Sequence, residues 1–115
     1  MAAILECSDQ WGRAIELEED IWLRKIVKGG LRLPEHSLVS VRLTLEEPDF
    51  VMFDKSHGDG ECFYRANVLP DPLDHLYLKV CVKINQNLDD ATMLGRVLTA
   101  YPTDRVPRGE QRKWP

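Results

Sequence analysis

The stretch "LYLKVCVKI", residues 76–84, carries an aliphatic side chain at every second position. Successive side chains of a β-strand point to opposite faces of a sheet, so this period predicts a strand with one apolar face. The apolar face holds Leu76, Leu78, Val80, Val82 and Ile84. The opposite face holds Tyr77, Lys79, Cys81 and Lys83. We expect the first face to lie on the core and the second to be open to solvent or a ligand.

Three further segments have the composition of short strands, namely "DFVMFD" (49–54), "ECFYRANV" (61–68) and "GRVLTAY" (95–101). They are rich in aromatic and branched residues, and turn-forming segments separate them. None of the connections is long enough to hold a crossover helix. Together with residues 76–84, these segments are therefore expected to form four antiparallel neighbours.

Two helices are predicted before these strands. In the first, Ser8 or Asp9 is a capping residue type, Gly29 and Gly30 are a stop signal, and apolar residues recur at steps of four and seven. These apolar residues are Trp11, Ile15, Trp22 and Ile26. The second helix is predicted within "LPEHSLVSVRLTLEEPDF" (33–50), because Pro34 and Glu35 suit a first turn and Pro48 ends it. Its apolar face holds Leu38, Val41 and Leu45.

Length and composition indicate a single domain spanning residues 1–115, since the chain has 115 residues of which 43% are hydrophobic. The predicted fold class is α+β, with N-terminal helices packed on a four-stranded antiparallel β-sheet. Cys7, Cys62 and Cys81 have no paired spacing of the kind that zinc sites use, so no metal and no cofactor is expected. The chain lacks a signal-peptide pattern and a bilayer-length apolar run, which predicts a cytoplasmic protein with no membrane partner.

The formal net charge is −4, but residues 96–115 hold five Lys and Arg residues against two Asp and Glu residues. A local cationic segment on an acidic body attracts phosphate, although basic tails more often serve only solubility.

The open face of the sheet is the candidate site. We assign Arg65 to this face, beside Lys79, and Thr99 and Tyr101 share one face of the last strand. The expectation is that these four side chains converge on one polar surface. Arg, Lys, Thr and Tyr are also ordinary residues of a solvated sheet, so a purely structural interpretation stays open.

The order of short motifs resembles a known family. A Pro-Glu-His element, "LEEPDFVMFD", "FYR", "YLKVCV", "VLTAYPTD" and a trailing Gly-Glu and Trp-Pro follow one another from about Leu33 to the end. In this order they resemble the phage and bacterial branch of the superfamily of small metal-independent ribonucleases that joins barnase, EndoU, the tRNA-cleaving colicins and RelE-type toxins. The family pattern has His before Pro-Glu, whereas this chain has "LPEH" (33–36).

The resemblance implies an RNA-cleaving site on the open face of the sheet. It implies catalytic roles for His36, Arg65, Lys79, Thr99 and Tyr101. RNA-backbone contacts are expected from Lys83, Arg105, Arg108, Arg112 and Lys113. Metal-free cleavage by the 2′-hydroxyl needs a base, for which a neutral His36 at a helix start is suited. It also needs fixed positive charge on the phosphorane oxygens, which Arg65 and Lys79 would supply.

The predicted function is therefore a metal-independent endoribonuclease-like domain of the toxin type, with RNA and an inhibitor (antitoxin) protein as partners. Two alternatives remain open from the sequence. One is a catalytically inactive module of the same fold that binds RNA, and the other is a module that binds a protein partner.

Overall fold

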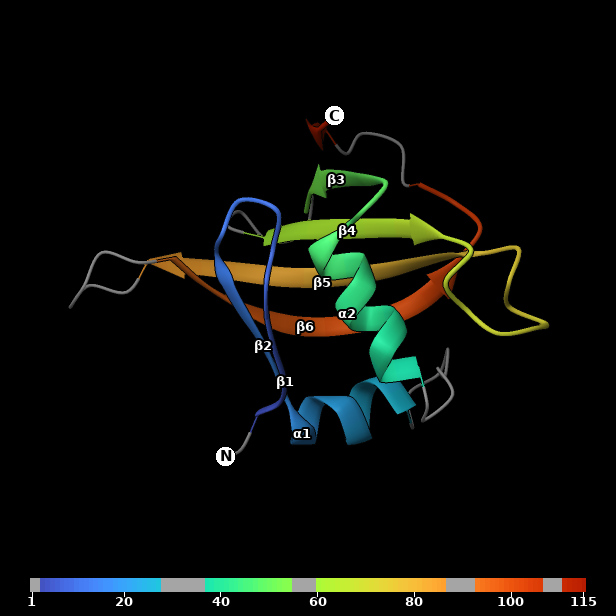
Figure 1. The fold of residues 1–115 in the computed structure, drawn as a ribbon, viewed down its shortest axis with the longest axis horizontal. Coiled ribbons are helices and arrows are strands. Elements are labelled where there is room, and N and C mark those ends of the chain that lie inside the picture. The colour runs from blue at the N-terminus through green and yellow to red at the C-terminus, as the bar shows by residue number, and fades with distance from the viewer. Residues whose placement is uncertain (1–2, 28–36, 55–59, 87–92, 107–110) are drawn as a thin grey trace.

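The computed structural model describes residues 3–27, 37–54, 60–86, 93–106 and 111–115, and it shows one seven-stranded sheet with little helix (Figure 1). The strand order is β1-β2-β6-β5-β4-β3-β7. The strands are β1 (Ala3–Ser8), β2 (Ala14–Glu18), β3 (Phe50–Phe53), β4 (Gly60–Ala66), β5 (Tyr77–Gln86), β6 (Met93–Thr103) and β7 (Arg112–Trp114). The helical segments are α1 (Glu19–Ile21), continued by the π-helical η1 (Trp22–Val27), and α2 (Leu38–Glu46).

The predicted fold class is wrong, because the start of the chain adds strands to the sheet instead of packing on it as a helix. β1 and β2 form an antiparallel hairpin, and β2 then pairs in parallel with β6, so the sheet is mixed. The period of two in "AIELE" (14–18) decides this structure: Ile15 and Leu17 are buried and alternate with half-buried or exposed neighbours. Trp11, which the helical spacing placed on an apolar stripe, lies in the hairpin turn and is 41% exposed.

Asp9 organises this turn instead of capping a helix. Its Oδ1 atom accepts the backbone N–H groups of Trp11 and Arg13, both at 2.9 Å. Gly12 has a φ of 79°, a left-handed conformation that glycine adopts without steric cost. The side-chain oxygen that makes Asp a helix cap also makes it a turn residue, so the residue type alone did not distinguish the two structures.

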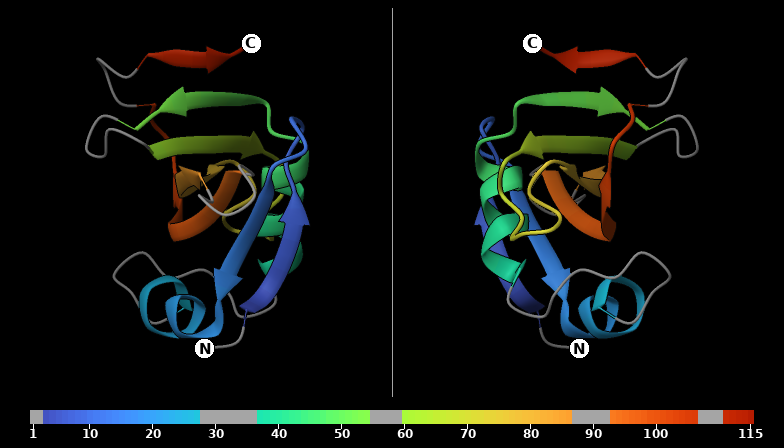
Figure 2. Two further views of the ribbon diagram at one scale, coloured as in Figure 1. Left: turned by 90° about the vertical axis from the view of Figure 1, so that its left-hand side faces the viewer. Right: turned by 90° about the vertical axis from the view of Figure 1, so that its right-hand side faces the viewer.

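The four predicted strands are present as β3, β4, β5 and β6, and they pair as antiparallel neighbours. The second predicted helix is α2, with Val41 and Leu45 fully buried, although the start of the prediction lies outside the described residues. The β1–β2 hairpin and α2 lie on the same side of the central strands β3 to β6, and the segment that follows β6 runs on the other side (Figure 2). Within the described residues, no helix combines the length and the apolar character needed to cross a bilayer.

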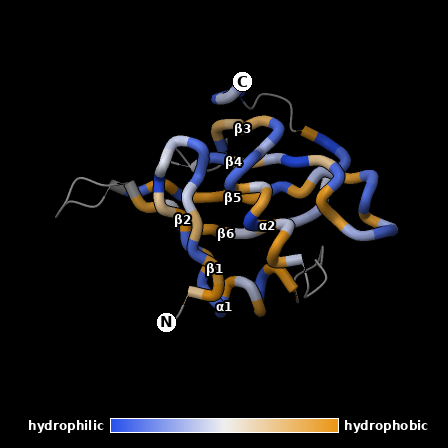
Figure 3. The backbone as a smooth tube through the Cα atoms, in the orientation of Figure 1, coloured by the Kyte–Doolittle hydropathy of each residue, from blue (hydrophilic) through white to orange (hydrophobic). Residues whose placement is uncertain are grey.

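Apolar side chains form a large cluster between the sheet and α2 and a small one on the opposite face. The large cluster includes Phe63, Leu78, Val80, Val82 and Val97. The small cluster comprises Phe50, Met52, Cys62, Tyr64 and Cys81, with Tyr77 and Val106 packed against it. Figure 3 shows hydrophobic residues along the central strands and hydrophilic ones at the tip of the β1–β2 hairpin. The face predicted to be open therefore carries a second, partly covered cluster.

Candidate functional site

The sheet face away from α2 brings together six side chains, here called the back-face cluster. They are Cys62, Tyr64, Lys79, Cys81, Thr99 and Tyr101. The strand register places them in two rows, because Tyr64, Lys79 and Tyr101 are direct partners across β4, β5 and β6. Cys62, Cys81 and Thr99 form the neighbouring row. Directly opposed residues of antiparallel strands project from the same face, so three of the predicted site residues do converge.

Lys79 is a buried cation in this cluster, with 6% of its surface exposed. Its Nζ atom lies 5.4 Å from the centroid of the Tyr64 ring and 5.6 Å from that of Tyr101. Such distances allow cation–π attraction. Burial alone would lower the pKa of Lys79, but the hydrogen bond with Tyr64 and nearby groups more than offset it and the pKa lies above its usual value. The side chain is therefore a fixed positive charge at neutral pH.

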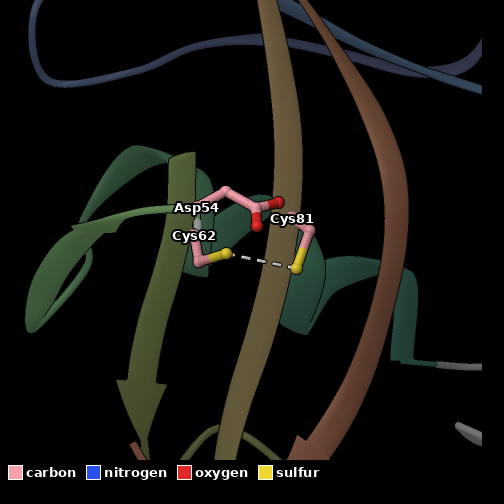
Figure 4. A group of neighbouring side chains, drawn as sticks. All are labelled: Asp54, Cys62 and Cys81. Carbon is pink, nitrogen blue, oxygen red and sulfur yellow. Dashed lines mark hydrogen bonds between the residues drawn. The ribbon is translucent and has the colours of Figure 1, made fainter. Parts of the chain in front are cut away.

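Cys62 and Cys81 face each other in the second row, with their Sγ atoms 3.3 Å apart. The hydrogen bond with Cys81 and burial raise the pKa of the Cys62 thiol well above its usual value, so this thiol is protonated near neutral pH. Asp54, which directly follows β3, has its carboxylate beside them (Figure 4). The ligand atoms of these three residues all lie within 4.8 Å of one another, and this set can hold a metal ion.

Arg65 lies on the opposite face of the sheet, so its predicted convergence with Lys79 is wrong. It is the direct partner of Leu78, which packs on the α2 side. Its Nη1 group donates a hydrogen bond to the carbonyl of Glu47, the residue that caps the end of α2. Among the residues that the structure describes, the buried Nε of Arg65 has no acceptor. The geometry indicates a role in ending the helix and gives the predicted catalytic role no support.

Replacing Arg65 with alanine is expected to lower the free energy of unfolding by about 1–3 kcal/mol, because a charged donor to the end of α2 is lost. Urea denaturation monitored by circular dichroism measures the change. The control is Arg42→Ala, since Arg42 lies on the exposed side of α2 and pairs with Glu46 at 3.3 Å, and we expect about 0–1 kcal/mol there. Equal midpoints for wild type and Arg65→Ala would contradict the capping role.

The predicted RNA-backbone residues are spread over the molecule. Lys83 is exposed on the same face as Lys79, two positions beyond Cys81. Arg105 is exposed in the segment after β6. His36 and Arg108 lie outside the described residues, so their positions relative to the cluster are not assigned.

The last two of these cations, Arg112 and Lys113, are neighbours on β7 and point to opposite faces of the sheet. The guanidinium carbon of Arg112 lies 5.0 Å from the centroid of the Phe50 ring, at the border of the back-face cluster. Lys113 instead donates a hydrogen bond of 2.6 Å to Glu61. Arg112 is thus exposed near the site, whereas Lys113 is held in an ion pair on the other face.

A network of charges on the α2 side was not foreseen from the sequence. Arg13 donates to both carboxylate oxygens of Glu61, at 2.9 and 2.7 Å, and its Nε donates to Asp9 at 2.6 Å. Lys113 binds the same Glu61 carboxylate. This network joins the hairpin turn, β4 and β7, and its residues are 48 and 52 positions apart, so no local pattern predicts it. Through Glu61, the network holds the β1–β2 turn and the C-terminal strand β7 against β4.

The back-face cluster is therefore the candidate site, with a buried ammonium group, three hydroxyl-bearing side chains and two thiols on three adjacent strands. Comparisons with known proteins found no matching family model, no matching curated protein and no matching solved structure.

Proposed function

We propose that this protein is a metal-independent ribonuclease-like domain that holds an RNA phosphate at the back-face cluster. The observation that carries the proposal is the position of Lys79, whose buried ammonium group lies between the rings of Tyr64 and Tyr101. A charge in a poorly screened site interacts far more strongly with a phosphate than the same charge in water. Thr99, in the adjacent row, adds a hydroxyl that can donate to a phosphate oxygen.

The chemistry that these residues suit is attack of the 2′-hydroxyl on the adjacent phosphorus. In that reaction the new O–P bond forms as the bond to the 5′-oxygen breaks, and negative charge grows on the non-bridging oxygens. Lys79 would stabilise that charge, and the Tyr101 phenol would give a proton to the leaving oxygen or stack on a base. The resemblance of the motifs to metal-independent ribonucleases supports the same assignment. His36 remains the predicted base.

Exposed cations near the cluster suit a backbone ligand. Lys83 projects from the same face of β5, Arg112 borders the cluster, and Arg105 follows the end of β6. Each phosphate that such a side chain neutralises releases counterions, so RNA binding should weaken as salt rises.

A second candidate is a module of the same site that binds RNA without cleaving it. The burial of Lys79 favours this candidate, because a side chain that is 6% exposed contacts a phosphate directly only if its neighbours move, whereas its charge attracts the RNA backbone without such contact. The Tyr64 and Tyr101 rings then serve to keep the charge in place.

The test is incubation of the purified protein with RNA in excess EDTA. We expect fragments that carry a 2′,3′-cyclic phosphate and a free 5′-hydroxyl. The matched control substrate has a single 2′-deoxynucleotide at the main cleavage position, and it should stay intact there because the attacking hydroxyl is missing. A mobility shift without fragments would favour the binding module. If the RNA shows neither a mobility shift nor fragments, both candidates are contradicted.

A further inference from the structure

Two thiols and a carboxylate meet at the end of the β3–β4 hairpin, at the edge of the back-face cluster (Figure 4). We propose that Asp54, Cys62 and Cys81 bind a Zn²⁺ ion. This site does not depend on the proposed ribonuclease function, because RNA cleavage in EDTA and metal binding are measured separately. The spacing of the cysteines along the chain gives no signal for it, since they are 19 residues apart.

The positions of the three ligands are fixed by backbone pairing. Cys62 and Cys81 are direct partners on β4 and β5. The backbone N–H of Asp54 donates to the carbonyl of Gly60 at 2.9 Å, which continues the β3–β4 pairing by one residue. Asp54, two residues beyond Met52 and directly after β3, therefore projects from the same face as Met52 and Cys62. Ligands on three paired segments need little ordering when an ion binds, which favours affinity.

The distances suit a tetrahedral ion after a small movement. Zn–S bonds of about 2.3 Å at a tetrahedral angle place two sulfurs about 3.8 Å apart. The Sγ atoms are 3.3 Å apart, and all ligand atoms lie within 4.8 Å of one another. Small side-chain rotations would open the thiol pair, without a change of strand register. Three protein ligands leave one position for water, and the half-buried Asp54 gives that position access to solvent.

Charge also favours a divalent cation here. Binding of Zn²⁺ would release the two thiol protons, so two thiolates and a carboxylate would carry three negative charges, of which Zn²⁺ leaves one; the ammonium group of Lys79, two residues from Cys81 on the same face of β5, offsets it. A bound cation is attracted by all three groups, and it uses the Asp54 carboxylate, which a disulfide between the two cysteines would not.

The experiment uses the full chain, reduced and stripped of metal by chelation. Titration with Zn²⁺ against a chromophoric chelator should give one ion per chain. Co²⁺ should give the visible bands of a tetrahedral ion and sulfur-to-cobalt charge-transfer absorption. The thermal midpoint should rise with Zn²⁺ and return on addition of EDTA. Removal of any one of the three ligand side chains should weaken the affinity for Zn²⁺ by more than about 100-fold, because changes to groups that only support a metal ligand already cost about 10–100-fold.

The variants separate the site from the fold. Cys62→Ser and Asp54→Asn keep the size of their side chains and should weaken metal binding while circular dichroism stays unchanged. Cys7→Ser is the matched control, because the third cysteine lies on β1 and should leave the stoichiometry and the cobalt spectrum intact. A stoichiometry far below one, a cobalt spectrum without sulfur charge transfer, or equal losses in Cys7→Ser would overturn the proposal. A folded Asp54→Asn with unchanged affinity would remove the carboxylate from it.

Discussion

Replacing Glu61 with alanine is expected to lower the free energy of unfolding by about 3 kcal/mol. Its carboxylate accepts three hydrogen bonds, two from Arg13 and one from Lys113, and its side chain is only 8% exposed. Removal of one partner of a buried ion pair typically costs about 3–5 kcal/mol, because the remaining charge stays buried without compensation. Asp9 still pairs with Arg13 in the variant, so we expect the lower end of that range.

The control is Asp20→Ala, which removes the carboxylate from an Arg–Asp pair of 2.6 Å on the surface. The side chains of Arg24 and Asp20 are 66% and 34% exposed, so solvent replaces the lost partner and a much smaller loss of stability than for Glu61→Ala is expected. Urea denaturation at pH 7 measures both variants. A loss below about 1 kcal/mol for Glu61→Ala would mean that the network contributes no more than a surface pair.

The same network predicts how stability depends on pH. Burial alone would raise the pKa of Glu61, but the hydrogen bonds from Arg13 and Lys113 hold it below its usual value. Because the pKa of Glu61 is lower in the folded protein than in the unfolded chain, its ionised carboxylate stabilises the fold. This contribution is complete above the pKa of the unfolded chain, about 4.3, and it disappears as the pH falls through the pKa of the folded protein. The difference in stability between wild type and Glu61→Gln should therefore narrow as the pH drops below about 4. A constant difference would contradict this assignment.

The sequence predicted the elements that carry their own local signals. Strands β3 to β6 are short apolar segments between turn residues, and α2 has buried Val41 and Leu45 four residues apart. The N-terminal hairpin was missed because its pairing partner is distant: Ile15 lies beside Gly95, 80 residues along the chain. At Gly95 an added Cβ would come within 3.0–3.1 Å of side-chain atoms of Val82, Ile15 and Ile84, so this close approach favours glycine. The alternation in residues 14–18 is a local strand signal, but no spacing within residues 3–27 identifies β6 as the partner of β2.

The site was predicted only in part because composition did not fix the face of β4. One face of the predicted strand carries Cys62 and Tyr64 and the other carries Phe63 and Arg65, so each holds an aromatic and a polar residue. Charge favoured Arg65 as the outward residue. In the structure its long side chain reaches the end of α2 instead, and pairing of Tyr64 with Lys79 sets the face. The opposed thiols follow from that register.

Replacing Lys79 with methionine is expected to lower the RNA-cleavage rate by about 10²–10³, the usual cost of removing a group that stabilises transition-state charge. Methionine keeps the length of the side chain and packs well against the Tyr64 and Tyr101 rings, so the cluster should stay folded. Single-turnover rates at saturating RNA in EDTA give the effect on the chemical step. Circular dichroism and the thermal midpoint check that the variant is folded.

The matched variant is Lys83→Gln, because Lys83 lies on the same face of the same strand but is exposed. Loss of an exposed phosphate contact weakens RNA affinity without touching the chemical step. We therefore expect weaker binding, a slope of log K against log salt concentration that is smaller by about 1, and an unchanged rate at saturating RNA. A lower saturating rate in Lys79→Met and only a weaker affinity in Lys83→Gln would distinguish the two lysines, which are four residues apart. The first charge would act on the transition state, and the second would only attract RNA. Equal losses of affinity with unchanged rates would favour the binding module. A folded Lys79→Met with the rate and affinity of wild type would leave the buried lysine as a packing element between two tyrosines, and the cleavage proposal would fail with it.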